Sequence, residues 1–212
     1  MSVQAALEPG FSWQDYQGWP DDERWELIDG QAYAMAPAPS TRHQRVAARL
    51  YARLERAVDG KGCQPFIAPV DLRLSDFDVV QPDVLLVCDP DQIHDSHIEG
   101  PPALVVEVLS PATATRDLRQ KKALYQRFGV AFYLVIHPLE QYAQLFRLSA
   151  SGQYDTGQII GTDESLELEL GGGLQIPLWE VFDLPAPGSE PEKAVHHPLG
   201  STDVHVASGD TP

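Results

Sequence analysis

The sequence contains few cysteines, few basic residues and no long apolar run. Its 212 residues include only two cysteines, Cys63 and Cys88, which form no CxxC motif. We therefore expect no disulfide framework and no cysteine-based metal site, and we expect a reducing compartment. No apolar stretch approaches the roughly 18 residues of a membrane helix, and the N-terminus lacks the basic and apolar regions of a secretory signal. These absences predict a soluble cytoplasmic protein with no membrane segment.

Positive charge is scarce and unevenly placed. Lysine and arginine number 15 against 31 aspartates and glutamates, so the formal net charge is −16. This balance argues against a generally basic nucleic-acid binder. Most of the basic residues nevertheless fall in two segments, 42–61 and 116–127. A surface polarised in this way can follow a phosphate backbone despite the negative total.

Composition divides the chain into one domain and a tail. Residues 1–184 carry the apolar and periodic segments, whereas residues 185–212 are rich in proline, glycine and serine and have no such pattern. We expect a single domain over 1–184 and a disordered tail over 185–212. The tail holds three histidines, His196, His197 and His205, which could bind a metal weakly, although a solvated tail is the simpler interpretation.

The order of helical and strand patterns predicts an α/β (α+β) fold, in which helices flank a mixed β-sheet core. A hairpin is expected around Asp29-Gly30. One helix is expected over about 41–59 and a second over about 117–128, with its end at Gly129. Runs rich in valine, leucine and isoleucine before and after the second helix are typical of strands.

Two acidic residues interrupt runs that are otherwise apolar. Asp83 lies in VVQPDVLLV and Glu107 in ALVVEVL, and such runs are typical of strands covered on both faces. A carboxylate in such a strand is unfavourable unless it is paired, hydrogen-bonded or bound to a metal. Two of them on neighbouring strands would form a site for a hard divalent cation. The alternative is two unrelated structural acids, each satisfied by backbone donors or a basic partner.

The helix over 117–128 directs one of two adjacent lysines inward. At about 100° per residue, Lys121 lies within an apolar arc of about 120°, whereas Lys122 points about 100° away. The apolar residues of this arc are Leu118, Leu124, Tyr125 and Phe128. An inward ammonium needs an anionic partner, so Asp83, Glu107 and Lys121 form one candidate constellation; the alternative is a buried ion pair without chemistry. Because methionine suits an apolar face, Lys121→Met is expected to preserve the fold.

The helix over 41–59 carries two further candidate features. His43 lies in the centre of its apolar face, where it is either a core histidine or a catalytic residue. On another face, arginines recur every three or four residues and form a basic stripe, which is either a solvated face or a nucleic-acid contact. The candidate contacts are Arg42, Arg45, Arg49 and Arg53. Joint replacement of Arg45, Arg49 and Arg53 with glutamine is expected to leave stability almost unchanged, because these residues lie outside the apolar face.

Taken together, these motifs resemble the Uma-two family of the PD-(D/E)XK restriction-endonuclease-like superfamily. The matching pieces are WELIDG, the histidine in STRHQRV, PVDLRL, QPDVLLV, EVLSP, the DLRQKKALY helix and GVAFYLVIHP, within about residues 11–184. The resemblance implies the mixed sheet of the restriction-endonuclease-like fold. The sequence differs from the superfamily motif at one position, because Leu109 stands where the motif usually has a lysine. The Uma-two pattern places its lysine on the following helix, here at Lys121.

The same resemblance implies a role for each site residue. Asp83 and Glu107 would hold one or two Mg²⁺ or Mn²⁺ ions. Lys121 would orient the attacking water or offset the developing negative charge. Glu26 would be an additional ligand or an outer acid, and His43 matches a family histidine of unassigned role.

The activity that the resemblance implies is that of a metal-dependent endonuclease, which hydrolyses DNA phosphodiester bonds. The alternative is a non-catalytic interaction or assembly module with the same fold, whose acids and lysine form a structural network. A homodimer would suit cleavage of both strands, although no motif indicates one.

Overall fold

The computed structural model describes residues 10–20, 22–35, 38–170 and 172–189. Most of the expected tail, from residue 190 onward, lies outside the described residues. The domain boundary at residue 184 and the disorder of the tail therefore remain predictions.

Helices and strands alternate along the described chain. The helical segments are α1 (Trp13–Tyr16), α2 (Thr41–Ala57), the 3₁₀ turn η1 (Pro90–Gln92), α3 (Ala114–Arg116), the π-helical segment η2 (Asp117–Lys121), α4 (Lys122–Phe128) and α5 (Leu178–Phe182). The strands are β1 (Trp25–Ile28), β2 (Gln31–Ala34), β3 (Gln64–Ile67), β4 (Asp71–Ser75), β5 (Asp78–Val80), β6 (Val84–Val87), β7 (His97–Glu99), β8 (Leu104–Val108), β9 (Phe132–His137), β10 (Tyr142–Arg147), β11 (Gln158–Ile160), β12 (Ser165–Leu168) and β13 (Leu174–Pro177). Within the described ranges, none of these helices is long and apolar enough to cross a membrane.

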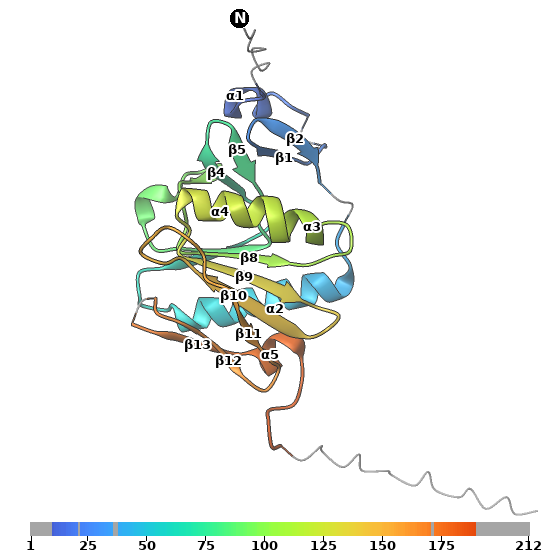
Figure 1. The fold of residues 1–212 in the computed structure, drawn as a ribbon, viewed down its shortest axis with the longest axis vertical. Helices are drawn as coiled ribbons and strands as arrows, with labels where there is room; N and C mark the ends of the chain where they lie inside the picture. The colour runs from blue at the N-terminus through green and yellow to red at the C-terminus, as the bar shows by residue number, and fades with distance from the viewer. Residues whose placement is uncertain (1–9, 21, 36–37, 171, 190–212) are drawn as a thin grey trace, which may run out of the picture.

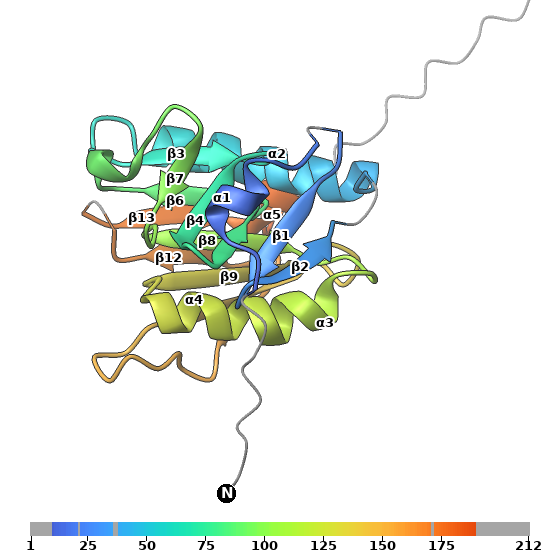
Figure 2. The same cartoon turned by 90° about the horizontal axis from the view of Figure 1, so that it is seen from above.

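A mixed six-stranded sheet forms the centre of the molecule, in the order β11-β10-β9-β8-β6-β3. β8 and β9 are parallel, and the other neighbours are antiparallel. Figures 1 and 2 show α2 on one side of this sheet and α4 on the other. β6 and β8 are buried along their whole length, as expected for strands covered on both faces. The predicted α/β (α+β) fold, with helices flanking a mixed sheet, is confirmed.

Alternation along the strands divides the apolar side chains between two cores. Val106 belongs to the core on the α2 side, together with Leu50 of that helix. Val105 belongs to the core on the α4 side, together with Leu124. Glu107 follows Val105 by two positions, so its side chain lies on the α4 side of the sheet.

A second sheet, in the order β2-β1-β5-β4-β7, adds apolar side chains to the core on the α4 side. The predicted hairpin is confirmed, because β1 and β2 are antiparallel and Asp29 and Gly30 connect them with φ angles of 52° and 73°. Two consecutive positive φ angles are typical of a type I′ turn. This hairpin matters for the site because β1 carries Glu26.

The second predicted helix begins at Ala114, earlier than expected, and is not α-helical throughout. α3, η2 and α4 follow one another directly, and the helix ends at Gly129, as predicted, with φ at 83°. The turn from Asp117 to Lys121 is π-helical. The expectation of a regular α-helix is therefore wrong at this turn. Such wider turns are rare and occur frequently at functional sites.

The two cysteines form a disulfide, which corrects the expectation drawn from their number and spacing. In the antiparallel pair of β3 and β6, Gln64 lies opposite Val87, so Cys63 and Cys88 are the next residues to face each other. The disulfide therefore depends on strand register, which cysteine spacing does not reveal. It also removes the cysteine argument for a reducing compartment, and the cytoplasmic location remains a prediction.

Candidate functional site

The pairing of β6 with β8 brings the two predicted metal ligands together. Val84 lies opposite Val106 in this antiparallel pair, so Asp83 and Glu107 are the next residues to face each other. Asp83 directly precedes β6, and its Oδ2 accepts a hydrogen bond of 2.7 Å from the backbone N–H of Val108. Glu107 is 4% exposed. The acids are neighbours, as the sequence predicts.

Lys121 enters the same cluster from the π-helical segment η2. Its side chain is 5% exposed, and Nζ lies 2.6 Å from Oε1 of Glu26 and 3.0 Å from Oε1 of Glu107. The same Nζ is 3.8 Å from Oδ1 of Asp117. Lys122 is directed elsewhere, with its amine 3.6 Å from the centre of a phenylalanine ring. The two adjacent lysines therefore have the different directions expected from helical periodicity.

Two further carboxylates complete this cluster. Glu26 is 2% exposed, and its Oε1 accepts a hydrogen bond of 3.1 Å from the backbone N–H of Gln81. The guanidinium of Arg116 lies 3.7 Å from Oε2 of Glu26. Asp117 is also buried, although it is not among the residues predicted from the sequence. The available signal was its position four residues before Lys121, within the same arc of the helix.

Burial and neighbouring charge oppose each other in the cluster. Burial raises the pKa of Glu107 well above its ordinary value, although the ammonium of Lys121 opposes the rise. Burial likewise raises the pKa of Asp117, again against the effect of Lys121. Burial alone would lower the pKa of Lys121, but the carboxylates of Glu107 and Glu26 outweigh it and raise that pKa. Lys121 is therefore held in its charged form.

Existing hydrogen bonds leave one oxygen open on each predicted metal ligand. Oε1 of Glu107 accepts hydrogen bonds from Nζ of Lys121 and, at 2.7 Å, from the hydroxyl of Tyr125. Oδ2 of Asp83 accepts the backbone hydrogen bond described above and lies 3.2 Å from Nε2 of His43. Within the described part of the chain, Oε2 of Glu107 and Oδ1 of Asp83 make no hydrogen bond. Both acids can therefore accept a ligand.

His43 lies near the N-terminus of α2, on the buried face of the helix. The side chain of Ser40 caps the helix, accepting a hydrogen bond of 3.2 Å from the backbone N–H of His43. Burial alone would lower the pKa of His43, but the contact with Asp83 raises it above the ordinary value. Among the described residues, none makes a hydrogen bond with the buried Nδ1 of His43. The helix thus brings His43 to the acids, and its catalytic role remains a prediction.

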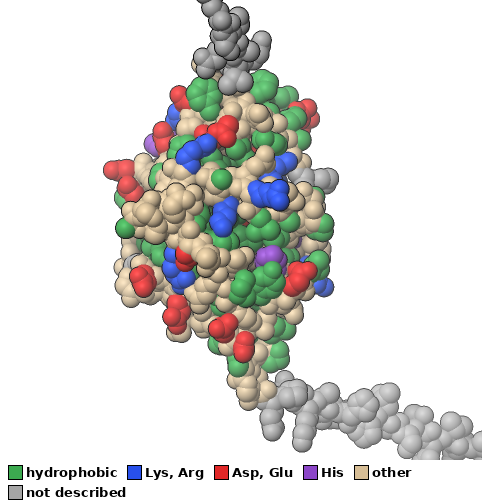
Figure 3. Space-filling model, in the orientation of Figure 1, with side chains coloured by type: hydrophobic (Ala, Val, Ile, Leu, Met, Phe, Trp, Pro, Cys, Tyr) green, Lys and Arg blue, Asp and Glu red, His purple; other side chains and the backbone are tan. Residues whose placement is uncertain are grey.

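These side chains surround a cavity of about 410 Å³. Its lining includes all the predicted catalytic residues, namely Asp83, Glu107, Lys121, Glu26 and His43. Arg24, Arg116 and Asp117 also contribute to the lining. On the face that carries α4, basic side chains gather over the helix (Figure 3). One cavity thus combines open carboxylate oxygens with nearby positive charge.

The basic stripe of α2 contacts α5 and the residue that follows it. Arg45 and Arg49 lie 2.8 and 2.6 Å from Oδ2 of Asp183. Arg53 pairs with the side chain of Glu180, whose backbone carbonyl accepts a hydrogen bond of 3.1 Å from Arg49. The expectation that replacing Arg45, Arg49 and Arg53 leaves stability unchanged did not include these contacts, which the replacement would remove. Their contact with nucleic acid remains a prediction.

Residues 13–179 match the Uma2 family, which is described as "Putative restriction endonuclease". The chain belongs to the Uma2 family. This assignment confirms the resemblance inferred from the motifs. The Uma2 chain is also 34% identical over 122 residues to the uncharacterized protein slr1290 of Synechocystis sp.. That alignment covers 55% of the chain and 63% of the relative, so the chain spans less than two thirds of the relative's length.

A solved structure shares the fold of this Uma2 protein. It is a putative nuclease belonging to DUF820 from Anabaena variabilis, with a TM-score of 0.66 and 15% sequence identity. The match covers 82% of the Uma2 chain and 98% of the other chain. At this identity the similarity shows a common fold alone.

Proposed function

We propose that this protein is a metal-dependent endonuclease that hydrolyses phosphodiester bonds in DNA. One observation carries the proposal. Asp83, directly before β6, and Glu107, on the adjacent β8, line one cavity, and each keeps an oxygen without a hydrogen bond from the described chain. Carboxylate oxygens are preferred ligands of Mg²⁺ and Mn²⁺. The donor set therefore fits one or two such ions.

The protein groups around these acids have distinct roles in the proposed reaction. Asp83 and Glu107 would hold a divalent ion, which would supply a water molecule of lowered pKa and positive charge beside the scissile phosphate. Lys121 stabilises the negative charge that develops on that phosphate. Glu26 positions the lysine, because its Oε1 lies 2.6 Å from Nζ. His43 holds the Asp83 carboxylate through Oδ2, at 3.2 Å.

DNA contact is proposed to begin at the N-terminal end of α2. Arg42 is exposed there, and the next two residues, His43 and Gln44, line the cavity. Arg45, Arg49 and Arg53 already pair with Asp183 or Glu180, so contact of these residues with DNA would compete with those ion pairs. The cytoplasmic location and the homodimer remain predictions.

A non-catalytic module with the same fold is the alternative. The observation that favours it is the contact of 3.0 Å between Lys121 and Glu107, because this pair already offsets part of the buried charge without a metal. Under this alternative, the cluster would stabilise the helix on the sheet and would cleave nothing.

A metal titration tests the proposed site. At 100 times its Kd, a ligand that binds only the folded state stabilises it by about 2.7 kcal/mol. For a domain of this size, Mg²⁺ or Mn²⁺ should then raise the melting temperature by roughly 5–10 °C. The rise should disappear in Asp83→Asn and Glu107→Gln, because each variant removes one carboxylate charge.

Plasmid cleavage tests the reaction itself. Both variants should lose cleavage by on the order of 10²-fold or more, the scale of losing one electrostatic catalytic group. Asp78→Asn is the matched control, because Asp78 is 4% exposed but lies outside the cavity lining. Equal metal-induced shifts in all variants would reject the two-acid site. Metal binding by the wild type without cleavage of any DNA form would instead support the non-catalytic module.

A further inference from the structure

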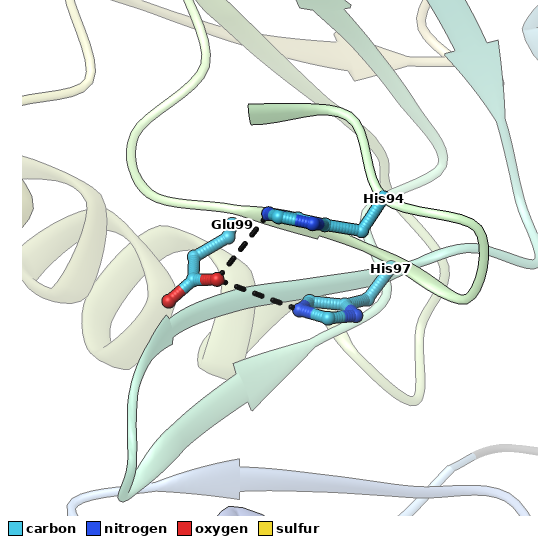
Figure 4. Close-up of side chains that lie close together, drawn as sticks. All are labelled: His94, His97 and Glu99. Atoms are coloured by element: carbon cyan, nitrogen blue, oxygen red, sulfur yellow. Dashed lines mark ion pairs between the residues drawn. The ribbon is translucent and has the colours of Figure 1, made fainter. Parts of the chain in front are cut away.

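A second group of metal-ligating side chains lies at the edge of the five-stranded sheet. His97 and Glu99 belong to β7, and His94 lies in the loop just before this strand. Each residue offers one ligand atom, and the three atoms lie within 4.8 Å of one another. Figure 4 shows the two imidazole rings stacked above each other, each with a nitrogen directed at the Glu99 carboxylate. The group shares no residue with the cavity of Asp83 and Glu107.

The geometry of the group is convergent. Nε2 of His94 lies 3.3 Å from Oε2 of Glu99, and Nε2 of His97 lies 3.8 Å from the same oxygen. The ring centroids are 4.9 Å apart, with 15° between the planes. His97 and Glu99 occupy alternate positions of β7, so their side chains share one face of the strand. A tight turn supplies His94, because its backbone N–H donates a 3.0 Å hydrogen bond to the carbonyl of His97.

Neighbouring side chains leave the right atoms free for a ligand. Oγ of Ser96 lies 3.0 Å from Nδ1 of His97 and can accept a hydrogen bond from Nδ1–H. In that tautomer the lone pair of the ring is on Nε2. That Nε2 is buried, and no described residue hydrogen-bonds to it. Arg73 donates a 2.9 Å hydrogen bond to Oε1 of Glu99, which leaves Oε2 on the histidine side. The ring of Trp13 packs against His97, with centroids 5.0 Å apart.

We propose that His94, His97 and Glu99 bind a divalent transition-metal ion of the Zn²⁺ type. Two imidazole nitrogens and one carboxylate oxygen form a donor set that zinc accepts, with water completing a tetrahedral site. Zinc bonds of about 2.0–2.2 Å place neighbouring tetrahedral ligands roughly 3.3–3.6 Å apart. The two histidine–glutamate spacings of 3.3 and 3.8 Å are close to these values. Because the three ligand atoms lie within 4.8 Å of one another, the two histidine nitrogens need to approach each other by at most about 1.5 Å, which rotation of the exposed His94 side chain allows. Nitrogen ligands also distinguish this site from the oxygen-only set of Asp83 and Glu107.

Titration of the full chain with Zn²⁺, monitored by calorimetry, tests the site. All measurements use a starting variant in which His196, His197 and His205 are replaced with glutamine, so that these three residues cannot bind Zn²⁺. Excess Mg²⁺ is added to occupy the oxygen-only sites. We expect one equivalent of Zn²⁺ to be lost, or bound at least tenfold more weakly, in His94→Gln and in His97→Gln. His137→Gln is the matched control, because His137 is also partly buried but belongs to β9.

Binding of Co²⁺ provides a second readout, which is spectroscopic and not calorimetric. The visible absorption bands of tetrahedral Co²⁺ should appear with the starting variant and disappear in Glu99→Gln. This variant also guards against misfolding, since Glu99 is exposed and circular dichroism can confirm its structure. Unchanged Zn²⁺ stoichiometry and affinity in the His94, His97 and Glu99 variants would overturn the proposal. Absence of saturable binding to the starting variant would overturn it as well.

Discussion

Replacing Lys121 with methionine tests whether its charge holds the acidic cluster together. Methionine keeps a similar length and helix propensity but removes the ammonium. In the structure, Nζ lies 2.6, 3.0 and 3.8 Å from oxygens of Glu26, Glu107 and Asp117. The substitution therefore leaves buried carboxylates without their cation. The expectation that Lys121→Met preserves the fold rests on the apolar helical face alone and does not include this cost.

The size of the effect follows from the burial of these groups. Removing one partner of a buried ion pair lowers the free energy of unfolding by about 3–5 kcal/mol. At about 2–4 °C per kcal/mol for a domain of this size, the melting temperature should fall by roughly 6–20 °C. Because typical domains have about 5–15 kcal/mol of stability, the variant should remain folded at low temperature. Loss of one electrostatic donor should also slow DNA cleavage by about 10²–10³.

Urea unfolding, followed by circular dichroism, measures the stability, and plasmid cleavage below the unfolding transition measures the rate. Lys122→Met is the control, because its amine lies over the Phe146 ring and contributes only about 0.5–1 kcal/mol. It should cleave DNA at nearly the normal rate. Adding Glu26→Gln to Lys121→Met should recover part of the stability, since it removes an unpaired charge, but should restore no activity.

Two results would refute this reasoning separately. Equal unfolding free energies for Lys121→Met and Lys122→Met would show that the acids do not depend on the Lys121 ammonium. Equal cleavage rates for the two variants would remove Lys121 from the proposed reaction, while leaving its structural role intact.

Further predictions concern α2. Arg49→Gln should lower the free energy of unfolding, measured in urea, by about 1 kcal/mol, because it breaks the contact with Asp183. The exposed control Arg42→Gln should change this free energy by less than about 0.5 kcal/mol. Equal values for the two variants would contradict the contact. The contact with Asp83 raises the pKa of His43 above 6.5. The stabilising effect of this contact should therefore be fully present below pH 6.5 and be lost as the pH rises through the raised pKa. Urea unfolding with a chelator should show this loss, and NMR titration should show a lower His43 pKa in Asp83→Asn; an unchanged pKa would argue against the contact.

Features set by neighbouring residues could be predicted from the sequence. The turn at Asp29-Gly30 requires positive φ angles, which this pair of residues tolerates. The end of the second helix at Gly129 depends on the same freedom. The different directions of Lys121 and Lys122 follow from helical periodicity alone. In each case the decisive geometry lies within a few positions of the chain.

Contacts between distant segments could not be predicted in the same way. The disulfide depends on the register of β3 with β6. The pairing of Arg49 and Arg53 with α5 depends on where the C-terminal part of the domain packs. Helical spacing placed the arginines on one face of α2 but did not indicate that this face contacts α5. Asp117 was missed for a different reason, because an acid at the start of a helix is usually explained by the helix dipole.

The route by which the lysine reaches Glu107 explains how the site departs from the superfamily motif. Leu109, at the position of the usual lysine, lies in the apolar core on the α4 side. The ammonium comes instead from η2, whose position over the sheet is fixed by a 2.9 Å hydrogen bond from the hydroxyl of Tyr133 to the carbonyl of Asp117. Tyr133 belongs to β9, the parallel neighbour of β8. Since the acid and the lysine belong to different elements, their contact depends on helix–sheet packing, and a change in that packing would alter the site without replacing any of its residues.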